Sequence, residues 1–156
     1  MRDHGISWVP TFAPVQVQLD RADVMGWNTE VRDHLAGILE NHARSLQRAL
    51  AMGVNVLVGS DAGSCGVAHG SGLFHEMELL ENAGMPTLDI LCQATHGNRL
   101  AFVNRQPFGC LDPDFLPRFI LTRSKPLDTV SELRQELLVV FDGTVANSAA
   151  LSLEDL

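Results

Sequence analysis

An amphipathic stretch that leads directly into a short apolar run constrains the fold of this 156-residue chain most strongly. Between about residues 28 and 52, apolar residues recur at three- and four-residue intervals, which is typical of a helix that buries one face. Asn28 and Thr29 are suitable N-cap residues, and Gly53 is a suitable stop. Residues 54–58 are then almost continuously apolar, as in a strand covered on both faces of a parallel sheet. A helix followed by a buried strand indicates βαβ architecture.

The stretches on either side extend this pattern. Ile6 to Phe12 is a β-prone run that Pro10 interrupts, which favours a strand end leading into a loop. Leu73 to Ala83 predicts a second helix, closed by Gly84, and Thr87 to Leu100 predicts a third. The order strand, helix, strand, helix, helix predicts an α/β fold. A complete eight-stranded barrel takes roughly 250 residues, so this chain is too short to form one.

A change of architecture is expected after the third helix. Residues 104–117 contain three prolines and a glycine, a composition that marks a linker. Residues 118–121 and 137–141 predict strands, and the second strand is followed by an Asp-Gly turn at 142–143 that leads into residues 144–145. This part of the chain is therefore expected to be a small β unit.

Charge and cysteine content exclude several classes of function. Eleven Lys and Arg against nineteen Asp and Glu give a net charge of −8. Phosphate backbones and anionic membrane surfaces would be repelled, so we expect neither a nucleic acid nor a membrane as partner. The N-terminus lacks the apolar core of a signal peptide, and no apolar run approaches the roughly 20 residues that span a bilayer. The three cysteines, Cys65, Cys92 and Cys110, form no C-x-x-C pair, which favours a reducing, cytoplasmic location.

Asp61 is the most informative polar residue, because it directly follows the apolar run in Gly59-Ser60-Asp61-Ala62-Gly63. A polar residue at the carboxyl end of a barrel strand faces the catalytic side of the barrel. One carboxylate oxygen there can bind a divalent cation while the other takes a proton from the attacking water. The alternative is that Asp61 caps the following turn, and spacing alone leaves both roles open.

Other candidate residues give weaker signals. The loop after Asp61 matches neither a serine nucleophile elbow nor a phosphate-binding glycine pattern. His69 lies in this loop and can approach a substrate, with a plain solvent-facing histidine as an equal alternative. Glu76 is interpreted as a first-turn acid favoured by the helix dipole, and His96 as structural. His34 and His42 share a helix face but lack a third metal ligand, so we interpret them as surface or boundary residues.

Four stretches in a fixed order resemble the C-terminal part of the metal-dependent amidohydrolase superfamily, nearest to its imidazolonepropionase-like and Xaa-Pro dipeptidase-like branch. Gly5 to Phe12 resembles the seventh barrel strand, which often ends in Val-Pro-Thr and an apolar residue. Residues 53–63 resemble the eighth strand and its Gly-Thr-Asp-Ala-Gly ending, with Ser60 in place of the usual threonine. The remaining matches lie in the following loop and helices and in the closing strands of a small β-sandwich: His69-Gly70, Glu76 to Leu80, Ala83-Gly84-Met85, Ala94-Thr95, Phe119-Ile120-Leu121, Pro126-Leu127, Leu133-Arg134 and Val139 to Val145.

This resemblance implies an α/β fold composed of the last two βα units of a (β/α)8 TIM-like barrel plus strands of a small β-sandwich. It divides the chain into a partial barrel at 1–103, a linker at 104–117, sandwich strands at 118–146 and a tail at 147–156. These boundaries are expectations of the resemblance.

The resemblance also implies a metal-dependent hydrolase of C–N bonds, with a small-molecule amide, cyclic imide or peptide as substrate. Asp61 matches the aspartate that contacts the metal, expected to be one or two zinc ions, and that passes a proton from water to the leaving amine. His69 matches a loop position near the substrate. The family's other ligands, a His-x-His pair, a lysine or glutamate and two further histidines, would lie upstream of residue 1. The chain is therefore expected to be a C-terminal fragment that is incomplete on its own.

The alternative is a non-catalytic module. Two barrel strands alone would have unpaired edges, which favour pairing with another chain. Such a module is expected to form a homo-oligomer or to associate with the missing N-terminal barrel segment.

Overall fold

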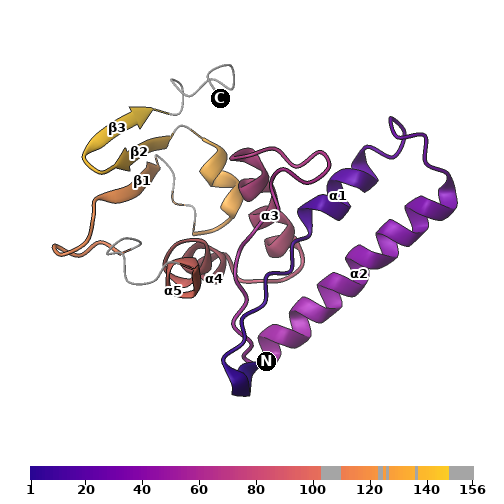
Figure 1. The fold of residues 1–156 in the computed structure, drawn as a ribbon, viewed down its shortest axis with the longest axis horizontal. Helices are drawn as coiled ribbons and strands as arrows, with labels where there is room; N and C mark the ends of the chain where they lie inside the picture. Colours follow the sequence, from indigo (N-terminus) through magenta and orange to yellow (C-terminus); the bar gives the residue numbers. More distant parts are fainter. Residues whose placement is uncertain (103–109, 123–124, 126, 136, 148–156) are drawn as a thin grey trace.

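The computed structural model describes residues 1–102, 110–122, 125, 127–135 and 137–147, in which helices surround two short inner segments and three strands form one small sheet (Figure 1). The predicted α/β class is confirmed as a mixed α/β fold. The elements in chain order are η1 (Arg2–His4), α1 (Ala13–Asp20), α2 (Thr29–Ala51), α3 (Ser71–Asn82), α4 (Thr87–Cys92), η2 (Gln93–Gly97), α5 (Asn98–Phe102), β1 (Arg118–Thr122), η3 (Val130–Arg134), β2 (Leu137–Phe141) and β3 (Thr144–Asn147).

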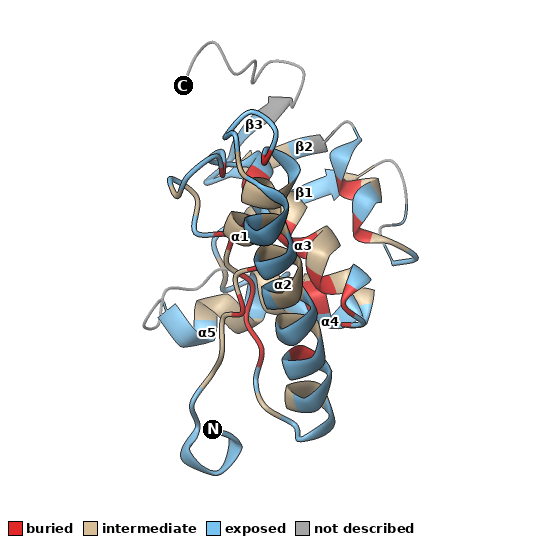
Figure 2. Cartoon of the chain, turned by 90° about the vertical axis from the view of Figure 1, so that its right-hand side faces the viewer, coloured by how far each residue is buried: buried red, intermediate tan, exposed pale blue. Residues whose placement is uncertain are grey.

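The long helix α2 begins and ends where its sequence signals predict. The Asn28 side chain accepts a hydrogen bond from the Val31 N–H at 3.0 Å, which satisfies one of the free donors of the first turn. Gly53 follows the helix with a φ of 68°, a left-handed conformation that glycine adopts without steric cost. Leu46 is fully buried on the inner side of α2, whereas much of the outer side is exposed (Figure 2). None of the helices in the described part of the chain has the length and apolar character needed to cross a membrane.

Helix α1 was not predicted from the sequence. Its eight residues, APVQVQLD, alternate between apolar and polar side chains, which is the pattern of a half-buried strand rather than a helix. Pro14 lies in the first turn, where the fixed φ of proline suits a helix and its missing N–H costs nothing. The helix packs against α2 and α3.

Two segments run side by side in parallel beneath these helices. We call them the first inner segment (residues 5–12) and the second inner segment (residues 53–60). The Trp8 N–H donates to the second segment at 2.9 Å, and the Trp8 carbonyl accepts from the Leu57 N–H at 2.8 Å. The predicted strands are thus reduced to one parallel bridge. The next donor on the first segment would belong to Pro10, which has no N–H, so the ladder stops there.

The other edge of the second inner segment is occupied by a side chain. Asn98 donates from Nδ2 to the Val58 carbonyl at 2.7 Å, and its Oδ1 accepts from the Val58 N–H at 3.3 Å. A neighbouring strand would use the same two backbone groups. The amide of Asn98 therefore stands in for a third strand.

The hydrophobic core is formed by residues of the inner segments, α2, α3, α4 and η3 and of the connection between α3 and α4. Buried parts of α3 and α4 are red in Figure 2. The buried members of the core are Phe12, Leu46, Val56, Val58, Met77, Leu80, Ala83, Met85, Ile90, Val130 and Leu133. The third predicted helix continues as far as Phe102 but is divided into α4, the π-helical turn η2 and α5. A π turn widens a helix by one residue and occurs often at functional sites.

The three strands form an antiparallel sheet in the order β1-β2-β3. The turn between β2 and β3 is Asp142-Gly143, as predicted, and its φ angles of 49° and 83° are those of a hairpin turn in which both residues are left-handed. Arg118 joins the turn to β1 through two hydrogen bonds of 2.8 Å to the Asp142 carboxylate. The predicted linker at 104–117 and tail at 147–156 lie partly outside the described residues, and the domain boundaries stay predictions.

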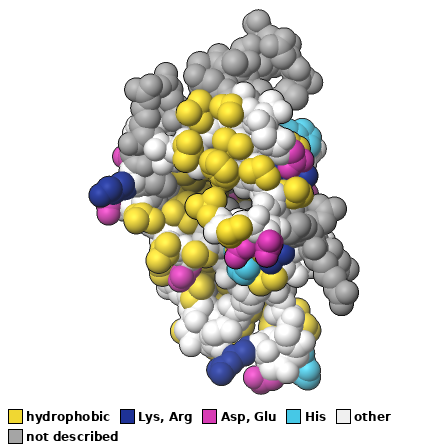
Figure 3. Space-filling view, turned by 90° about the vertical axis from the view of Figure 1, so that its left-hand side faces the viewer, with side chains coloured by type: hydrophobic (Ala, Val, Ile, Leu, Met, Phe, Trp, Pro, Cys, Tyr) yellow, Lys and Arg dark blue, Asp and Glu magenta, His cyan; other side chains and the backbone are white. Residues whose placement is uncertain are grey.

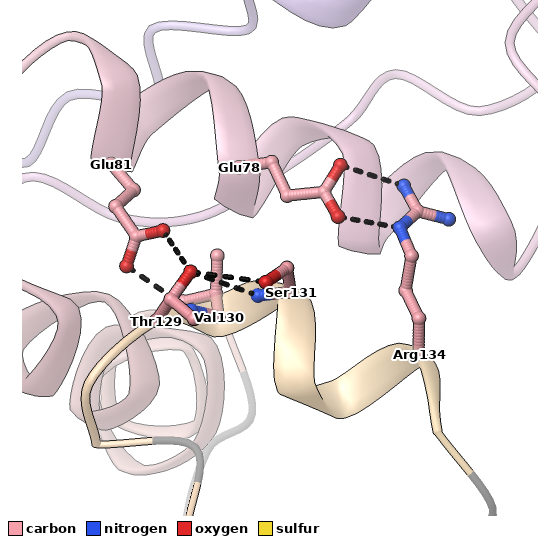
Figure 4. Close-up of polar contacts among 6 residues, drawn as sticks. All are labelled: Glu78, Glu81, Thr129, Val130, Ser131 and Arg134. Atoms are coloured by element: carbon pink, nitrogen blue, oxygen red, sulfur yellow. Dashed lines mark hydrogen bonds and ion pairs between the residues drawn. The ribbon is translucent and has the colours of Figure 1, made fainter.

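The short helix η3 attaches this C-terminal unit to α3 through two glutamates (Figure 4). Glu81 accepts from the Thr129 hydroxyl at 2.7 Å and from the Val130 N–H at 3.1 Å. Glu78 is paired in a bidentate manner with Arg134, whose Nη2 lies 2.8 Å from Oε2. The hydrogen bond from Arg134 lowers the pKa of Glu78 below its ordinary value.

Candidate functional site

The carboxyl ends of the two inner segments meet at the same edge of the fold, because the segments run parallel. Close approach at this edge depends on Gly59. A methyl group at Gly59 would lie 2.8 Å from Cγ1 of Val9 on the first segment, which is too short for a carbon–carbon contact. The glycine therefore allows the two backbones to approach each other just before Asp61.

Asp61 lies immediately beyond this point and is exposed. Its φ of 51° is left-handed, a conformation that aspartate tolerates better than most residues. Its carbonyl accepts from the Ser64 N–H at 3.0 Å, so the backbone closes the turn. Within the described residues, the carboxylate has no hydrogen-bonding or ionic partner. Both oxygens are thus available to a ligand.

The His69 side chain lies beside the backbone of Gly63, in the same loop as Asp61. A methyl group at Gly63 would lie 3.5 Å from Nε2 of His69, so the imidazole stands over the backbone two residues beyond the carboxylate. The loop between them is held by backbone bonds, including Gly63 N–H to the Val67 carbonyl at 3.1 Å. The two predicted site residues are therefore parts of one loop, and their roles stay predictions.

Glu76 is the residue that the sequence interpretation missed. It is completely buried in α3, and its carboxylate accepts from the Phe12 N–H at 3.0 Å and from the Ala13 N–H at 2.7 Å. The interpretation as a first-turn acid is wrong, because α3 begins at Ser71 and Glu76 lies beyond its first turn; Glu76 is instead a clamp on the end of the first inner segment. Burial raises the pKa of Glu76 above its ordinary value, and the two backbone donors oppose this shift.

A signal for this burial was present in the sequence. Gly72, Glu76 and Leu80 are spaced four residues apart, and all three are buried on the same face of α3. A carboxylate at the centre of an apolar helix face requires donors from another element. The donors are 63 and 64 residues away in the chain, so spacing alone does not identify them.

The other histidines do not join this site. His34 is exposed, and His42 packs its ring edge-on against Phe12 with the ring centres 5.4 Å apart, which agrees with the surface or boundary interpretation. The part of the chain that the structure describes contains no group of three or more His, Cys, Asp or Glu side chains arranged to hold a metal ion.

Comparison with solved structures places this fold in larger enzymes. A Xaa-Pro dipeptidase with methionine bound in its active site matches with a TM-score of 0.78 and 22% identity, over 94% of this chain and 36% of that chain. Ochratoxinase from A. niger matches with a TM-score of 0.75 and 23% identity, over 93% and 32% of the two chains. A prolidase in complex with N-methylphosphonate-L-proline matches with a TM-score of 0.74 and 18% identity, over 94% and 36%.

The chain thus spans about a third of the length of these structures. No protein-family model and no curated protein sequence matches it. The predicted resemblance to Xaa-Pro dipeptidases and related amidohydrolases is confirmed, and at these identities it is a likeness of fold.

Proposed function

We propose that the chain is part of a metal-dependent hydrolase that cleaves C–N bonds in amides, cyclic imides or peptides. The observation that carries this proposal is the exposed carboxylate of Asp61 at the carboxyl end of the second inner segment, which has no partner within the described part of the chain. The two inner segments would be the last two strands of a (β/α)8 barrel, whose active sites lie at this end. The fold shared with prolidase and ochratoxinase supports the hydrolase class.

Asp61 fits a divalent metal as one oxygen ligand. Its carboxylate is exposed and has no partner in the described residues. A zinc ion bound there would act as a Lewis acid and favour ionisation of water. Catalytic zinc sites take about three protein ligands. Together with the partial coverage of the larger enzymes, this supports a chain that acts within a longer polypeptide or an assembly that supplies the other ligands.

Asp61 would then carry the proton of the reaction. One oxygen would accept a proton from the attacking water, and the same group would donate it to the departing nitrogen, as a general base followed by a general acid. His69 would contact the substrate from across the loop. The clamp of Glu76 on the first inner segment would fix the neighbouring wall of the site.

Replacing Asp61 with asparagine tests this role in the longest gene product that contains the chain. The side chain keeps its size but loses the ability to hold a proton, so metal-dependent hydrolysis of an Xaa-Pro dipeptide or an N-acyl amino acid should fall about 100-fold or more. Asp33→Asn on the exposed part of α2 is the matched control and should leave turnover unchanged. Near-normal hydrolysis by Asp61→Asn would remove Asp61 from the mechanism.

A second candidate function, a non-catalytic association module, is favoured by one observation on the sheet. Leu121, Leu138 and Val145 lie on one face of the sheet and are 52%, 41% and 62% exposed. On the opposite face of the sheet, Ile120 and Thr122 line a cavity of about 490 Å³. Figure 3 shows hydrophobic side chains around a hollow on the side of the molecule that lies at the left in Figure 1. Exposed apolar faces of this kind mark association surfaces.

Size-exclusion chromatography of the chain and metal analysis of the longest gene product that contains it separate the two functions. An oligomer that dissociates when Leu138 is replaced by lysine, together with a metal-free longer product, supports the module. A tightly held, stoichiometric metal ion in the longer product supports the hydrolase and contradicts the module.

A further inference from the structure

A thiol and an imidazole are paired at the opposite end of the inner segments from Asp61. Sγ of Cys110 lies 3.0 Å from Nδ1 of His96. The two residues come from different parts of the fold, because His96 belongs to the π-helical turn η2 and Cys110 follows α5 after the residues that the structure does not describe. This contact was not expected from the sequence, where His96 had only a structural interpretation.

The imidazole also lines a cavity of about 360 Å³. The walls of this cavity include Ser7 and Asn55, which lie near the amino ends of the two inner segments, and Cys92, Gln93 and His96 from the end of α4 and from η2. Cys110 is not among the lining residues, so it reaches the cavity only through its contact with His96. The volume of the cavity is within the range of small-molecule sites. Because Asp61 lies at the carboxyl ends of the same segments, this cavity is separate from the proposed hydrolytic site.

The π turn shapes the wall of the cavity. Gly97 has no side chain, and any Cβ at this position would collide with Oε1 of Gln93. Oε1 of Gln93 is itself buried and has no hydrogen-bond partner among the described residues. The π turn thus places Gln93 and His96 in the lining of one cavity.

We infer that Cys110 and His96 form a site of thiol–disulfide exchange, at which the Cys110 sulfur attacks a low-molecular-weight disulfide. Nδ1 of His96, in the tautomer that carries its proton on Nε2, accepts the thiol proton of Cys110. The thiolate attacks one sulfur of the disulfide, so that a new S–S bond forms and the original S–S bond breaks. The released thiolate takes the proton back from His96. The products are a mixed disulfide on Cys110 and one free thiol; the disulfide is the oxidant, because one of its sulfurs is reduced to the thiol while the Cys110 sulfur is oxidised.

The other two cysteines are internal references. Cys65 and Cys92 are both free and exposed, and neither has a hydrogen-bonded histidine among the described residues. Exposure alone would make them react faster than Cys110, which is half-buried. Faster reaction at Cys110 would therefore be a consequence of its imidazole partner.

The experiment exposes the folded chain to oxidised glutathione and follows each cysteine by peptide mass spectrometry over time. We expect the rate at Cys110 to exceed the rates at Cys65 and Cys92 about tenfold or more, within the range that a positioned base supplies. The His96→Gln variant should lower the rate at Cys110 to that of Cys65, whereas His34→Gln on α2 should change nothing.

Concentrated urea supplies a further arm, because it separates Cys110 from His96 and should equalise the three rates. The inference is overturned if Cys65 or Cys92 reacts as fast as Cys110 in the folded chain, if His96→Gln leaves the rate unchanged, or if the preference for Cys110 persists in urea. Should His96→Gln unfold, the comparison of the unaltered chain with and without urea decides the question.

Discussion

Replacing Glu76 with alanine removes the carboxylate that holds the junction between the first inner segment and α1. The N–H groups of Phe12 and Ala13 would lose their acceptor, and these residues are only 3% and 0% exposed, so bulk water does not reach them. Each buried donor left without a partner costs about 1–3 kcal/mol. The two donors together therefore cost about 2–6 kcal/mol.

Two further effects modify this value. The substitution leaves a cavity in the core, which adds to the loss. It also removes a carboxylate whose pKa is raised by burial, so the folded state no longer bears the cost of a desolvated charge. Because relief of the desolvated charge offsets part of the loss from the unpaired donors and the cavity, we expect the free energy of unfolding to fall by about 3 kcal/mol. Glu76→Gln keeps one acceptor oxygen and should lose about half as much.

Urea unfolding followed by far-UV circular dichroism measures these losses. Glu30→Ala is the matched control, because Glu30 is an exposed acid in the first turn of α2 and its removal should change stability by no more than about 0.5 kcal/mol. A loss below about 1 kcal/mol for Glu76→Ala, or an equal loss in the control, would refute the clamp.

Three further substitutions test other parts of the fold. The pKa of Glu78 is lowered by Arg134, so the stability that this pair contributes is present above pH 4.5 and is lost as the pH falls through the lowered pKa. Arg134→Ala should abolish this pH dependence when the free energy of unfolding is measured along an acid titration. The loss at neutral pH should be less than about 1 kcal/mol, because the pair is partly exposed. Gly59→Ala places a methyl group against Val9 and should lower the free energy of unfolding by about 1–3 kcal/mol, and an unchanged thermal midpoint would contradict the close approach. Asn98→Ala removes both side-chain hydrogen bonds to the second inner segment and should cost about 2 kcal/mol in urea unfolding, whereas a change near zero would show that water replaces them.

Local signals account for the elements that the sequence predicts correctly. The N-cap Asn28 and the stop at Gly53 define α2, and Asp142-Gly143 defines the hairpin of the small sheet. These signals act between residues that are neighbours in the chain, so the ends of α2 and the position of the hairpin turn can be predicted from a single sequence. Helix α1 was missed because its apolar residues alternate as in a strand, and packing against α2 and α3 outweighs that pattern.

Long-range contacts account for what could not be predicted. The partners of Glu76 are backbone N–H groups of another element. Almost every residue carries such a group, so the residue types in the sequence do not identify which ones bind Glu76. The contact between Cys110 and His96 likewise joins residues that are 14 positions apart in the chain. Asp61 could be singled out because its position after an apolar run is itself a local feature, although its role depends on residues around it in space.

The side-chain amide of Asn98 occupies the free edge of the second inner segment and can be displaced by another strand. An incoming strand would exchange two hydrogen bonds for two of the same kind, so docking at this edge would cost little enthalpy and mainly the reordering of one side chain. In the absence of such a strand, the amide of Asn98 occupies the backbone N–H and carbonyl of Val58. It therefore hinders nonspecific strand pairing at this edge but still allows a further strand to be added there.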